Sequence, residues 1–380
     1  MYVLHIPSWF PDDRSPYAGN FIEKHIAAIA MFYPSVSVKV VFTDHFQQRK
    51  SIDRYGNETR ITYYIKRRRW LPARLFSKIY RNYLYRKGIG EIYKEYGKPD
   101  LVHLHVALPM GFLARKISKK YHIPLVLTEH WTIYQPQNAD KFTDSLNGKL
   151  KKIYDSVSGY TTVSENLRLI INGKYPGIDS TVIPNVVDTK LFLPDHQNND
   201  KINIIHISTL KDEAKNFIGI LHVIEKLAAI RKDFVLKVIH ENPNEKAEKF
   251  VRDHDLSSHV VFLGNRNEEE VARELGKSDF LLLFSNYENL PCVIIESFSC
   301  GKPVLVTDVG GIREIVDQSR GIMVEAKNEN LLLEKLNWML DHYREYDKDA
   351  IRDYAADHFS KEIIGKQFAD FYHHVLFKQK

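Results

Sequence analysis

The sequence predicts an α/β fold made of two domains with mainly parallel sheets. Short apolar runs of strand length alternate with amphipathic helical segments over most of the 380 residues, and this alternation is typical of parallel sheets covered by helices. A chain of this length exceeds a typical single core and fits two domains of about 180 to 190 residues. The clearest unit of the pattern, residues 280–316, contains strand, loop, helix, strand, loop and helix in that order.

The elements of this unit follow from residue type. Phe280–Phe284 is an apolar run short enough for a buried strand. Pro291 suits the first turn of a helix, where its missing N–H costs nothing, and Gly301 suits the left-handed residue that follows a helix. We expect Pro303–Thr307 to form a second buried strand and Asp308–Gly311 to form a tight turn into another helix.

Two carboxylates stand near the carboxyl end of the first of these strands. Glu288 lies in the loop and Glu296 lies in the following helix, with seven residues between them. Ligands of open α/β sheets bind at that edge, and the first N–H groups of a helix, here those of Leu290, Cys292 and Val293, favour an anion. An anion flanked by two hydroxyl-binding carboxylates is the chemistry that binds a sugar nucleotide. We therefore expect a diphosphate between a hexose and a ribose.

The motifs around these acids resemble those of a known family. E-x7-E is followed by S-x-x-x-G-K-P-V and a G-G-x-x-E-I turn, as in the retaining glycosyltransferases of the GT-B fold (glycosyl transferases group 1). The resemblance implies two Rossmann-like domains, with a C-terminal helix that crosses back to the N-terminal domain. It also implies that Glu288, a predicted catalytic residue, contacts hydroxyls of the transferred sugar and that Glu296 holds the ribose diol. Asn289 and Leu290 are expected beside the donor.

The same resemblance implies further donor-site residues. In the family, the loop after the first strand of the C-terminal domain supplies an Arg and a Lys that clamp the donor diphosphate. Lys215 matches the Lys, but Thr209 stands at the position of the Arg, and Lys211 is the candidate replacement. A later V-x-F-L-G strand and loop lies near the nucleotide base in the family. Arg266 or the neighbouring backbone groups are therefore expected to read the base edge.

The start of the chain predicts a strand, a loop and a helix. Tyr2–Ile6 and Val36–Thr43 have the pattern of strands, and Asn20–Met31 has the pattern of a helix. The family has a glycine-containing donor loop before this helix, and Gly19 is its match; a simple turn explains the glycine equally well. No G-x-G-x-x-G follows the first strand, which argues against a dinucleotide fingerprint.

A polar cluster is predicted at the end of a later strand. Pro99–Ala107 is expected to be a strand with two histidines on one side, and Ile123–Thr128 the next strand. The family commonly carries T-x-H after that strand, and its His contacts the donor sugar or lies by the acceptor. The resemblance implies this role for His130, the second predicted catalytic residue. Glu129 is expected to orient His130 or to replace it.

The domain boundary is predicted near residue 190. Val182–Asp188 (VIPNVVD) resembles the family's inter-domain signature I-P-N-G-V-D, with Val186 in place of the Gly. The predicted domains are 1–190, which binds the acceptor; 191–355, which binds the nucleotide sugar; and 356–380, a helix that packs back on the first domain. The remaining strands and helices expected in the chain are Tyr160–Ser164, a helix from Glu165, Ile202–Ser208, a helix from Asn216, Phe234–His240, Glu245–Asp255, Val260–Leu263, Glu268–Leu275, Gly321–Val324, Glu329–Arg344 and Ala350–Phe377.

Charge is distributed unevenly along the chain. Residues 1–190 hold 29 Lys and Arg against 16 Asp and Glu, whereas residues 191–380 hold 25 against 32. Residues 66–87 carry nine basic residues and no acid, interleaved with aromatic and aliphatic residues. This pattern favours an interfacial helix on an anionic membrane, where the acceptor would also lie; a solvated basic helix packed on the sheet is the alternative. The predicted patch consists of Arg67, Arg68, Arg69, Trp70, Arg74, Lys78 and Arg81. No nucleic-acid module surrounds it, so we expect no nucleic-acid partner.

The remaining features limit cofactors and location. The two cysteines are too few for a disulfide framework and fit no zinc spacing, and no Asp-x-Asp metal motif appears on a loop. We therefore expect no metal and no other cofactor. The chain start lacks the basic region of a signal peptide, and no apolar run approaches the ~20 residues of a membrane span. We expect a cytoplasmic protein that is peripheral on the inner face of the plasma membrane.

These observations together predict the activity. The predicted protein is a metal-independent, retaining glycosyltransferase that moves a hexose or N-acetylhexosamine from a nucleoside-diphosphate sugar to a glycan or lipid-linked acceptor in polysaccharide biosynthesis. Two alternatives stay open: a GT-B nucleotide-sugar 2-epimerase, and a non-catalytic nucleotide-sugar-binding protein. The missing clamp Arg keeps the second alternative open.

Overall fold

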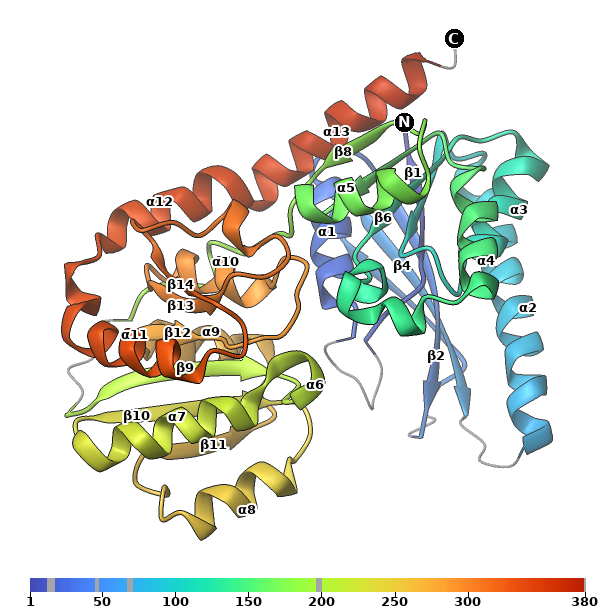
Figure 1. The fold of residues 1–380 in the computed structure, drawn as a ribbon. Helices are drawn as coiled ribbons and strands as arrows, with labels where there is room; N and C mark the ends of the chain where they lie inside the picture. Colours follow the sequence, from blue (N-terminus) through green and yellow to red (C-terminus); the bar gives the residue numbers. More distant parts are fainter. Residues whose placement is uncertain (12–17, 45–47, 67–70, 196–199, 379–380) are drawn as a thin grey trace. The chain divides into compact units, whose positions relative to one another are not determined.

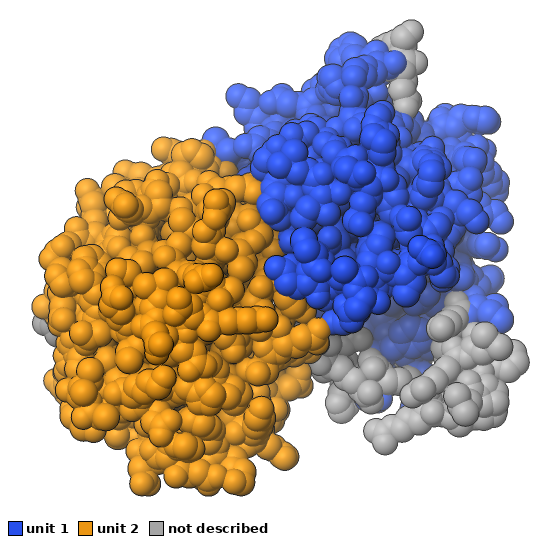
Figure 2. All heavy atoms as spheres, in the orientation of Figure 1, with its two compact units in different colours: residues 1–185, 361–380 blue, residues 186–360 orange. Residues whose placement is uncertain are grey.

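The computed structural model describes residues 1–11, 18–44, 48–66, 71–195 and 200–378, and only the backbone of residues 71–78. The chain divides into two compact units: unit 1 comprises residues 1–185 and 361–380, and unit 2 comprises residues 186–360 (Figure 2). The boundaries predicted from the sequence are 190 and 355. Each unit is an α/β domain with a mainly parallel sheet, so the predicted fold class is confirmed.

Unit 1 is built on an eight-stranded sheet (Figure 1). Its strands are β1 (Val3–Pro7), β2 (Ser35–Thr43), β3 (Lys50–Tyr55), β4 (Glu58–Lys66), β5 (Leu101–His105), β6 (Leu125–Glu129), β7 (Gly159–Thr162) and β8 (Ser180–Val182). Their order across the sheet is β3-β4-β2-β1-β5-β6-β7-β8, and only the β3–β4 pair is antiparallel. The chain begins in the middle of the sheet and adds strands on both sides. The order therefore reverses between β1 and β5.

Helices cover both faces of this sheet. They are α1 (Asn20–Ala30), α2 (Leu71–Tyr96), α3 (Gly111–Tyr121), the 3-10 helices η1 (Thr132–Tyr134) and η2 (Pro136–Lys141), α4 (Asp144–Tyr154), α5 (Glu165–Lys174) and the C-terminal α13 (Lys361–Phe377). Helices α1 and α13 pack against each other on one face, and α2 and α3 cover the other (Figure 1). Ser164 caps α5 by accepting a hydrogen bond from the Leu167 N–H, as its position before Glu165 predicts.

The β3–β4 hairpin is an element that the sequence analysis did not predict. Gly56, in the left-handed region at φ 58°, and Asn57 form its two-residue turn. The hairpin is joined to α2 by Glu91, whose carboxylate pairs with Lys50 at 2.6 Å and accepts a hydrogen bond from the Tyr63 hydroxyl at 2.8 Å. The basic segment thus leads from a strand into a helix that packs on β2 and β4.

Unit 2 is built on a six-stranded sheet in which every neighbouring pair is parallel. Its strands are β9 (Ile202–Ser208), β10 (Phe234–His240), β11 (Val260–Gly264), β12 (Phe280–Leu282), β13 (Val304–Thr307) and β14 (Gly321–Val324). Their order is β11-β10-β9-β12-β13-β14, the arrangement of a Rossmann domain. The strand order reverses between β9 and β12.

The helices of unit 2 lie on both faces of its sheet (Figure 1). They are α6 (Asp212–Lys215), α7 (Phe217–Ile230), α8 (Glu245–Asp253), α9 (Glu268–Lys277), α10 (Cys292–Ser299), the 3-10 helices η3 (Ile312–Glu314) and η4 (Tyr343–Glu345), α11 (Glu329–His342) and α12 (Lys348–Phe359). Gly301 is left-handed after α10, as predicted. The helix expected after Asp308–Gly311 is wrong in extent: the chain forms only the short η3, because residues 317–320 turn directly toward β14.

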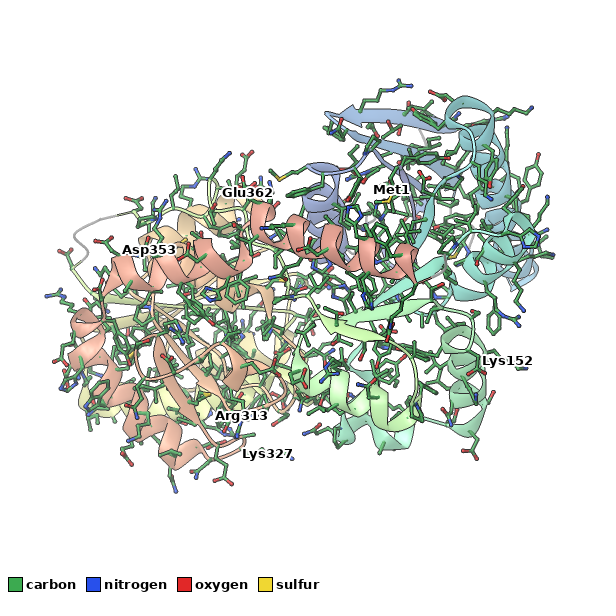
Figure 3. The ribbon with its side chains drawn as sticks, turned by 90° about the horizontal axis from the view of Figure 1, so that it is seen from above. Met1, Lys152, Arg313, Lys327, Asp353 and Glu362 are labelled. Carbon is green, nitrogen blue, oxygen red and sulfur yellow. The ribbon has the colours of Figure 1, made fainter. Side chains whose placement is uncertain are left out.

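The chain passes from one unit to the other twice, after Asn185 and after Ser360. Within unit 2 the two crossing points are adjacent, because the Val187 N–H donates to the Phe359 carbonyl at 2.9 Å and Val187 pairs with Ser360 in a parallel bridge. In Figure 3, Asp353 is labelled on α12, before the second crossing point, and Glu362 is labelled on α13, after it.

The C-terminal helix is part of unit 1, as the resemblance implied. Phe368, Phe371 and Tyr372 of α13 are buried, and the Tyr372 hydroxyl lies 2.6 Å from Nδ1 of His103 on β5. Gly365 sits where α13 meets α1, and a Cβ there would overlap the Ala28 carbonyl oxygen and crowd the Phe32 ring. Close backbone approach therefore requires glycine at this position.

Among the described helices, none combines the length and the apolar composition that crossing a bilayer would require.

We predict that Gly365→Ala lowers the free energy of unfolding by about 1–3 kcal/mol, because the new methyl group has no space between α13 and α1. Urea titration followed by far-UV circular dichroism measures this change. The control is Gly90→Ala in α2, where a Cβ would meet no atom within 4 Å and should be neutral or stabilising by about 0.5–1 kcal/mol. Equal effects of the two substitutions would contradict the packing.

Candidate functional site

The sheet order of unit 2 locates its binding edge. Ligands of open α/β sheets bind outside the carboxyl ends of the strands where the order reverses, here at the ends of β9 and β12. Two loops leave these ends: residues 209–216, which include α6, and residues 283–291, which lead into α10. Most of the donor-site residues predicted from the sequence lie on these two loops.

A charged pair joins the two loops. The Lys215 ammonium contacts the Glu288 carboxylate across a sequence separation of 73 residues. The Ser285 hydroxyl donates to the same carboxylate oxygen at 2.8 Å, and the Ser285 carbonyl accepts a hydrogen bond from Thr307 at 2.8 Å. Glu288 is 7% exposed, so its charge is held by partners and not by bulk water.

A glycine turn fixes the shape of the Glu288 loop. Gly310 has φ 58°, and a Cβ there would overlap the Glu288 carbonyl oxygen. The neighbouring Gly311 N–H donates to the Asn289 carbonyl at 2.8 Å. The turn after β13 therefore packs directly on residues 288–289 and limits their movement.

The other predicted donor residues of this loop are buried. Asn289 and Leu290 are 4% and 5% exposed, and Glu296, on the second turn of α10, is 7% exposed. Pro291 is the N-cap of α10 and provides no side-chain cap. Glu296 therefore lies inside unit 2 and does not face bulk solvent, in contrast to an ordinary surface acid.

The loop after β9 carries backbone strain on both sides of α6. Leu210 and Asn216 have positive φ values of 52° and 47°, which are costly for residues other than glycine and concentrate at functional sites. Thr209 and Lys211 are exposed. Lys215 is therefore the cation of this loop that contacts Glu288, and the Lys211 side chain remains at the surface.

Two further groups complete the description of this edge. Burial lowers the pKa of His206 to about 4, and the nearby Lys215 charge adds to the effect. The neutral His206 ring lies 2.9 Å from the Leu282 carbonyl and 2.7 Å from the Ser208 hydroxyl, so it joins the ends of β9 and β12. Arg266, after β11, lies 3.3 Å from the Asn265 carbonyl; the structure does not bring it into contact with Glu288.

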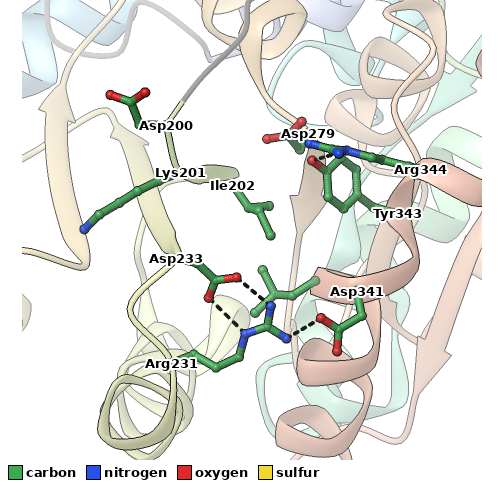
Figure 4. Close-up of a pocket in the computed structure, with 10 residues that line it drawn as sticks. Asp200, Lys201, Ile202, Arg231, Asp233, Asp279, Asp341, Tyr343 and Arg344 are labelled. Atoms are coloured by element: carbon green, nitrogen blue, oxygen red, sulfur yellow. Dashed lines mark hydrogen bonds and ion pairs between the residues drawn. The ribbon is translucent and has the colours of Figure 1, made fainter.

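A polar groove of about 370 Å³ lies at the opposite edge of the sheet (Figure 4). Its lining includes residues at the amino ends of β9, β10 and β12. Arg231 fills one side and contacts Asp233 at 2.6 Å and Asp341 at 2.7 Å. Because these charges are paired within the groove and lie at the amino ends of parallel strands, this is not the predicted donor site.

In unit 1, Gly19 has a packing role. It is the left-handed N-cap of α1 at φ 77°, and a Cβ there would lie 2.8 Å from the backbone of Trp9. Glycine is therefore required by the close approach of the two chain segments. The proposed contact with a donor stays a prediction.

Glu129 organises the loops after β5 and β6. Its carboxylate accepts hydrogen bonds from the N–H groups of Ala107 (3.1 Å), His130 (2.9 Å) and Trp131 (3.0 Å) and from the Tyr134 hydroxyl (3.2 Å). Burial raises the pKa of Glu129, and these donors act in the opposite direction. Of the two roles expected for Glu129, the structure favours orientation of His130.

His130 belongs to a cluster of five buried imidazoles. His5, His103 and His105 come from β1 and β5, His25 comes from α1, and His130 follows β6. The His130 ring lies 4.3 Å from the Phe21 ring and 5.2 Å from the His25 ring, between centroids. Burial lowers the pKa of His130 well below its usual value, so the ring is neutral and suited to hydrogen bonding.

The predicted basic patch is only partly described. Arg67, Arg68, Arg69 and Trp70 lie outside the described residues, and so do the side chains of Arg74 and Lys78; Arg81 is partly buried. In the next turns of α2, Ile79, Tyr80 and Tyr83 are exposed by 61%, 49% and 56%. From Leu84 onward, α2 packs on the sheet, and its buried side chains are Leu84, Tyr85, Ile89 and Ile92.

The sequence analysis missed two positioning residues, Ser285 and Gly310, and did not show that Glu129 acts through backbone N–H groups. These contacts have no local sequence pattern. The spacing of Ser285, three residues before Glu288, is the one signal that pointed to its contact.

Two family models match the chain. Residues 189–356 match the model described as glycosyl transferases group 1, and residues 23–191 match that described as glycosyltransferase family 4. An uncharacterized glycosyltransferase of Methanocaldococcus jannaschii is 30% identical over 250 residues, which cover 62% of this chain and 64% of the relative. N-acetyl-alpha-D-glucosaminyl L-malate synthase of Bacillus anthracis is 25% identical over 299 residues, which cover 73% of this chain and 75% of that protein.

A third relative is a putative teichuronic acid biosynthesis glycosyltransferase of Bacillus subtilis, 25% identical over 247 residues that cover 63% of this chain and 60% of the relative. The match thus spans less than two thirds of the length of the Methanocaldococcus and B. subtilis relatives.

Solved structures share the fold of the whole chain. Sucrose-phosphate synthase from Thermosynechococcus elongatus superposes with a TM-score of 0.81 at 17% identity, covering 100% of this chain and 99% of the other. Anabaena HepE, solved in complex with UDP, superposes with a TM-score of 0.71 at 15% identity, covering 98% and 100%. At these identities the likeness shows the fold, which is GT-B.

We predict that the protein loses stability steeply below pH 6.5. Burial lowers the pKa of His5 to about 3 and of His25 to about 4, and lowers those of His103, His105 and His130 well below the usual value. In the unfolded chain these groups titrate near 6.5. Between 6.5 and the folded pKa the unfolded state binds more protons, so acid favours unfolding by about 1.4 kcal/mol per pH unit for each imidazole.

Urea midpoints measured at pH 7.5, 6.5 and 5.5 check this prediction. His25→Gln should reduce the slope, because one buried imidazole is removed, whereas His358→Gln, at an exposed position of α12, should leave it unchanged. A midpoint that stays constant from pH 7.5 to 5.5 would contradict it.

Proposed function

We propose that this chain, in which residues 189–356 match the glycosyl transferases group 1 model and residues 23–191 match the glycosyltransferase family 4 model, is a metal-independent, retaining glycosyltransferase. It moves a hexose or N-acetylhexosamine from a nucleoside-diphosphate sugar to a glycan or lipid-linked glycan acceptor. The observation that carries the proposal is the Lys215–Glu288 pair at the edge of unit 2 where the strand order reverses. We place the protein in the cytoplasm, in polysaccharide biosynthesis.

The charges of this edge support a sugar-nucleotide donor. An ammonium group binds a diphosphate, and a carboxylate binds hydroxyls of a sugar. A bound diphosphate would compete with Glu288 for Lys215. The Glu288 carboxylate would then be available to the sugar hydroxyls and would keep its hydrogen bond from Ser285. Glu296, in the helix α10 into which the Glu288 loop leads, is the candidate for the ribose diol.

The same groups suggest how the leaving group is stabilised. Lys215 and the N-terminus of α10, which has no side-chain cap, would meet the charge that develops on the departing diphosphate. Two positive groups supplied by the protein make a metal ion unnecessary in this proposal. The acceptor hydroxyl would attack on the face of the leaving group, whose phosphate takes the proton. His130, a neutral ring in unit 1, would hydrogen-bond the sugar or the acceptor.

The exposed part of α2 supports a membrane-associated acceptor. Ile79, Tyr80 and Tyr83 remain exposed, with the Tyr80 and Tyr83 rings stacked at 6.0 Å, and Arg86 and Lys87 are exposed on the next turn. Aromatic and basic side chains on one helix suit the boundary of an anionic leaflet. We therefore propose peripheral contact with the inner face of the plasma membrane.

We predict that Glu288→Gln lowers kcat/KM for donor by ~100-fold or more, because the amide keeps the shape but neither pairs with Lys215 nor presents a charge to the sugar. The measurement is product mass after incubation with UDP-, GDP- and ADP-sugars and glycan or lipid-linked acceptors, in the presence of a chelator. Glu334→Gln, at an exposed position of α11, is the matched control and should retain full activity.

Three results would overturn the proposal in different ways. Product formed without any acceptor would indicate an epimerase, and donor binding without turnover would indicate a sensor. A product whose anomeric configuration is opposite to that of the donor, seen by NMR, would exclude the retaining mechanism.

We predict that Tyr83→Glu in α2 reduces flotation with vesicles of anionic lipid, because the acid is repelled by the leaflet and removes an aromatic contact. Ile230→Glu, at a 70% exposed position at the end of α7, adds the same charge elsewhere and should float as the unmodified protein does. If both variants float equally, the α2 surface is not the membrane contact.

A further inference from the structure

The short helix α6 depends on other parts of unit 2 for its position. It has only four residues, Asp212–Lys215, and a single helical turn fixes more dihedral angles than its few hydrogen bonds compensate. The last carbonyls of a helix also have no partner within it. Because Lys215 is the last residue of α6, the position of its ammonium group depends on the contacts that hold this turn.

One residue of the facing loop provides such contacts. The Asn286 main-chain N–H donates to the Ala214 carbonyl at 2.8 Å. The Asn286 side-chain amide donates from Nδ2 to the Glu213 carbonyl at 3.0 Å and to the Asp212 carbonyl at 3.4 Å. Asn286 therefore binds the carbonyls of the three residues that come directly before Lys215.

The orientation of the Asn286 amide follows from these partners. Carbonyl oxygens only accept hydrogen bonds, so Nδ2 and not Oδ1 must face Asp212 and Glu213. Oδ1 is buried and has no hydrogen-bond partner among the described residues. A buried acceptor without a partner costs free energy. The amide is therefore held in this orientation by its two donor contacts with α6, at the expense of its own oxygen.

The same two segments carry the charged pair. Glu288 follows Asn286 by two residues and pairs with Lys215. Ser285, directly before Asn286, donates to Glu288, and its carbonyl accepts a hydrogen bond from Thr307 at the end of β13. The segment 285–288 is thus fixed to the sheet through Ser285, and it holds α6 through Asn286.

The start of the loop after β9 is fixed separately. The Ser208 hydroxyl lies 2.7 Å from Nε2 of His206 and accepts a hydrogen bond from the Leu210 N–H at 3.0 Å. These contacts end at Leu210, before α6 begins. By themselves they leave the position of the Lys215 end of α6 undetermined, and Asn286 supplies what they lack.

We propose that Asn286 is a positioning residue for Lys215. By holding the carbonyls of α6, its amide sets the Lys215 ammonium where that group binds the diphosphate of a nucleotide. Asn286 acts through Lys215 and requires no contact with the nucleotide. The inference rests on the proposed function for its ligand, a nucleoside diphosphate. The contact between Lys215 and Glu288 provides a second readout that needs no ligand.

The first test measures the binding of UDP, GDP and ADP to the full chain by calorimetry. Asn286→Leu keeps approximately the size of the side chain and removes its donors without adding charge. We expect this substitution to weaken the binding of the preferred diphosphate by roughly 10-fold, the loss of one charge-assisted contact. In a chain that already carries Lys215→Gln, Asn286→Leu should cause no further loss, because no ammonium group remains to be displaced.

A matched control separates this effect from a general change of the surface. Asn330→Leu makes the same substitution at an exposed position of α11. It should bind the three diphosphates as the unmodified protein does.

The second test needs no nucleotide. Urea titrations of Lys215→Gln, Glu288→Gln and the double variant give the coupling energy between the two side chains. The same cycle is then measured in chains that also carry Asn286→Leu. We expect the coupling to be largely lost there, because α6 no longer holds Lys215 beside Glu288.

The results distinguish this inference from the proposed function. If the unmodified protein binds none of the three diphosphates, the donor assignment fails, and the stability cycle alone decides the role of Asn286. Equal losses of affinity with and without Lys215→Gln, or a coupling that Asn286→Leu leaves unchanged, would overturn the positioning role. Asn286→Ala takes the place of Asn286→Leu in the same scheme if the latter does not fold.

Discussion

The pairing of Lys215 with Glu288 is the contact on which the proposed chemistry depends. It joins the two loops that leave β9 and β12, the strands at which the sheet order of unit 2 reverses. A largely buried carboxylate is costly unless it is paired and hydrogen-bonded, and here Lys215 and Ser285 both hold it. Gly310 then packs against the Glu288 backbone, so the position of the acid is set from three directions before any donor binds.

Unit 1 also buries polar side chains, among them a group of neutral imidazoles. Five imidazoles, four from β1, β5 and the end of β6 and one from α1, lie together in this unit, and desolvation keeps them uncharged. The one acid among them, Glu129, is enclosed by three backbone N–H groups and the Tyr134 hydroxyl, an arrangement that fixes the loops on which His130 stands. The polar groups at the strand ends of unit 1 are therefore held in place, the imidazoles neutral through burial and the Glu129 carboxylate through its hydrogen bonds.

The sequence pattern was most reliable where local physics decides the outcome. β9, β10 and β14 have the predicted bounds, since their apolar runs are short and end in polar residues. The cap at Ser164 and the left-handed Gly301 also follow from residue type. The β3–β4 hairpin was missed although Gly56-Asn57 is a turn signal, because β3 is largely exposed and both strands mix charged with apolar residues. The helix expected after Gly311 shortens to η3, because the chain returns at once to β14.

By itself, the sequence determined the fold class, most strands and helices, and the loops that carry Glu288, Lys215 and His130, because these depend on apolar periodicity, caps and motif spacing. Only the tertiary structure decided which side chains meet. Lys215 and Glu288 are 73 residues apart, and His103 and Tyr372 are 269 apart; such contacts depend on strand order and on burial, neither of which local spacing encodes. The same holds for the histidine cluster, whose members come from four separate segments of the sequence. They come together only because three strands and a helix of unit 1 meet at one point.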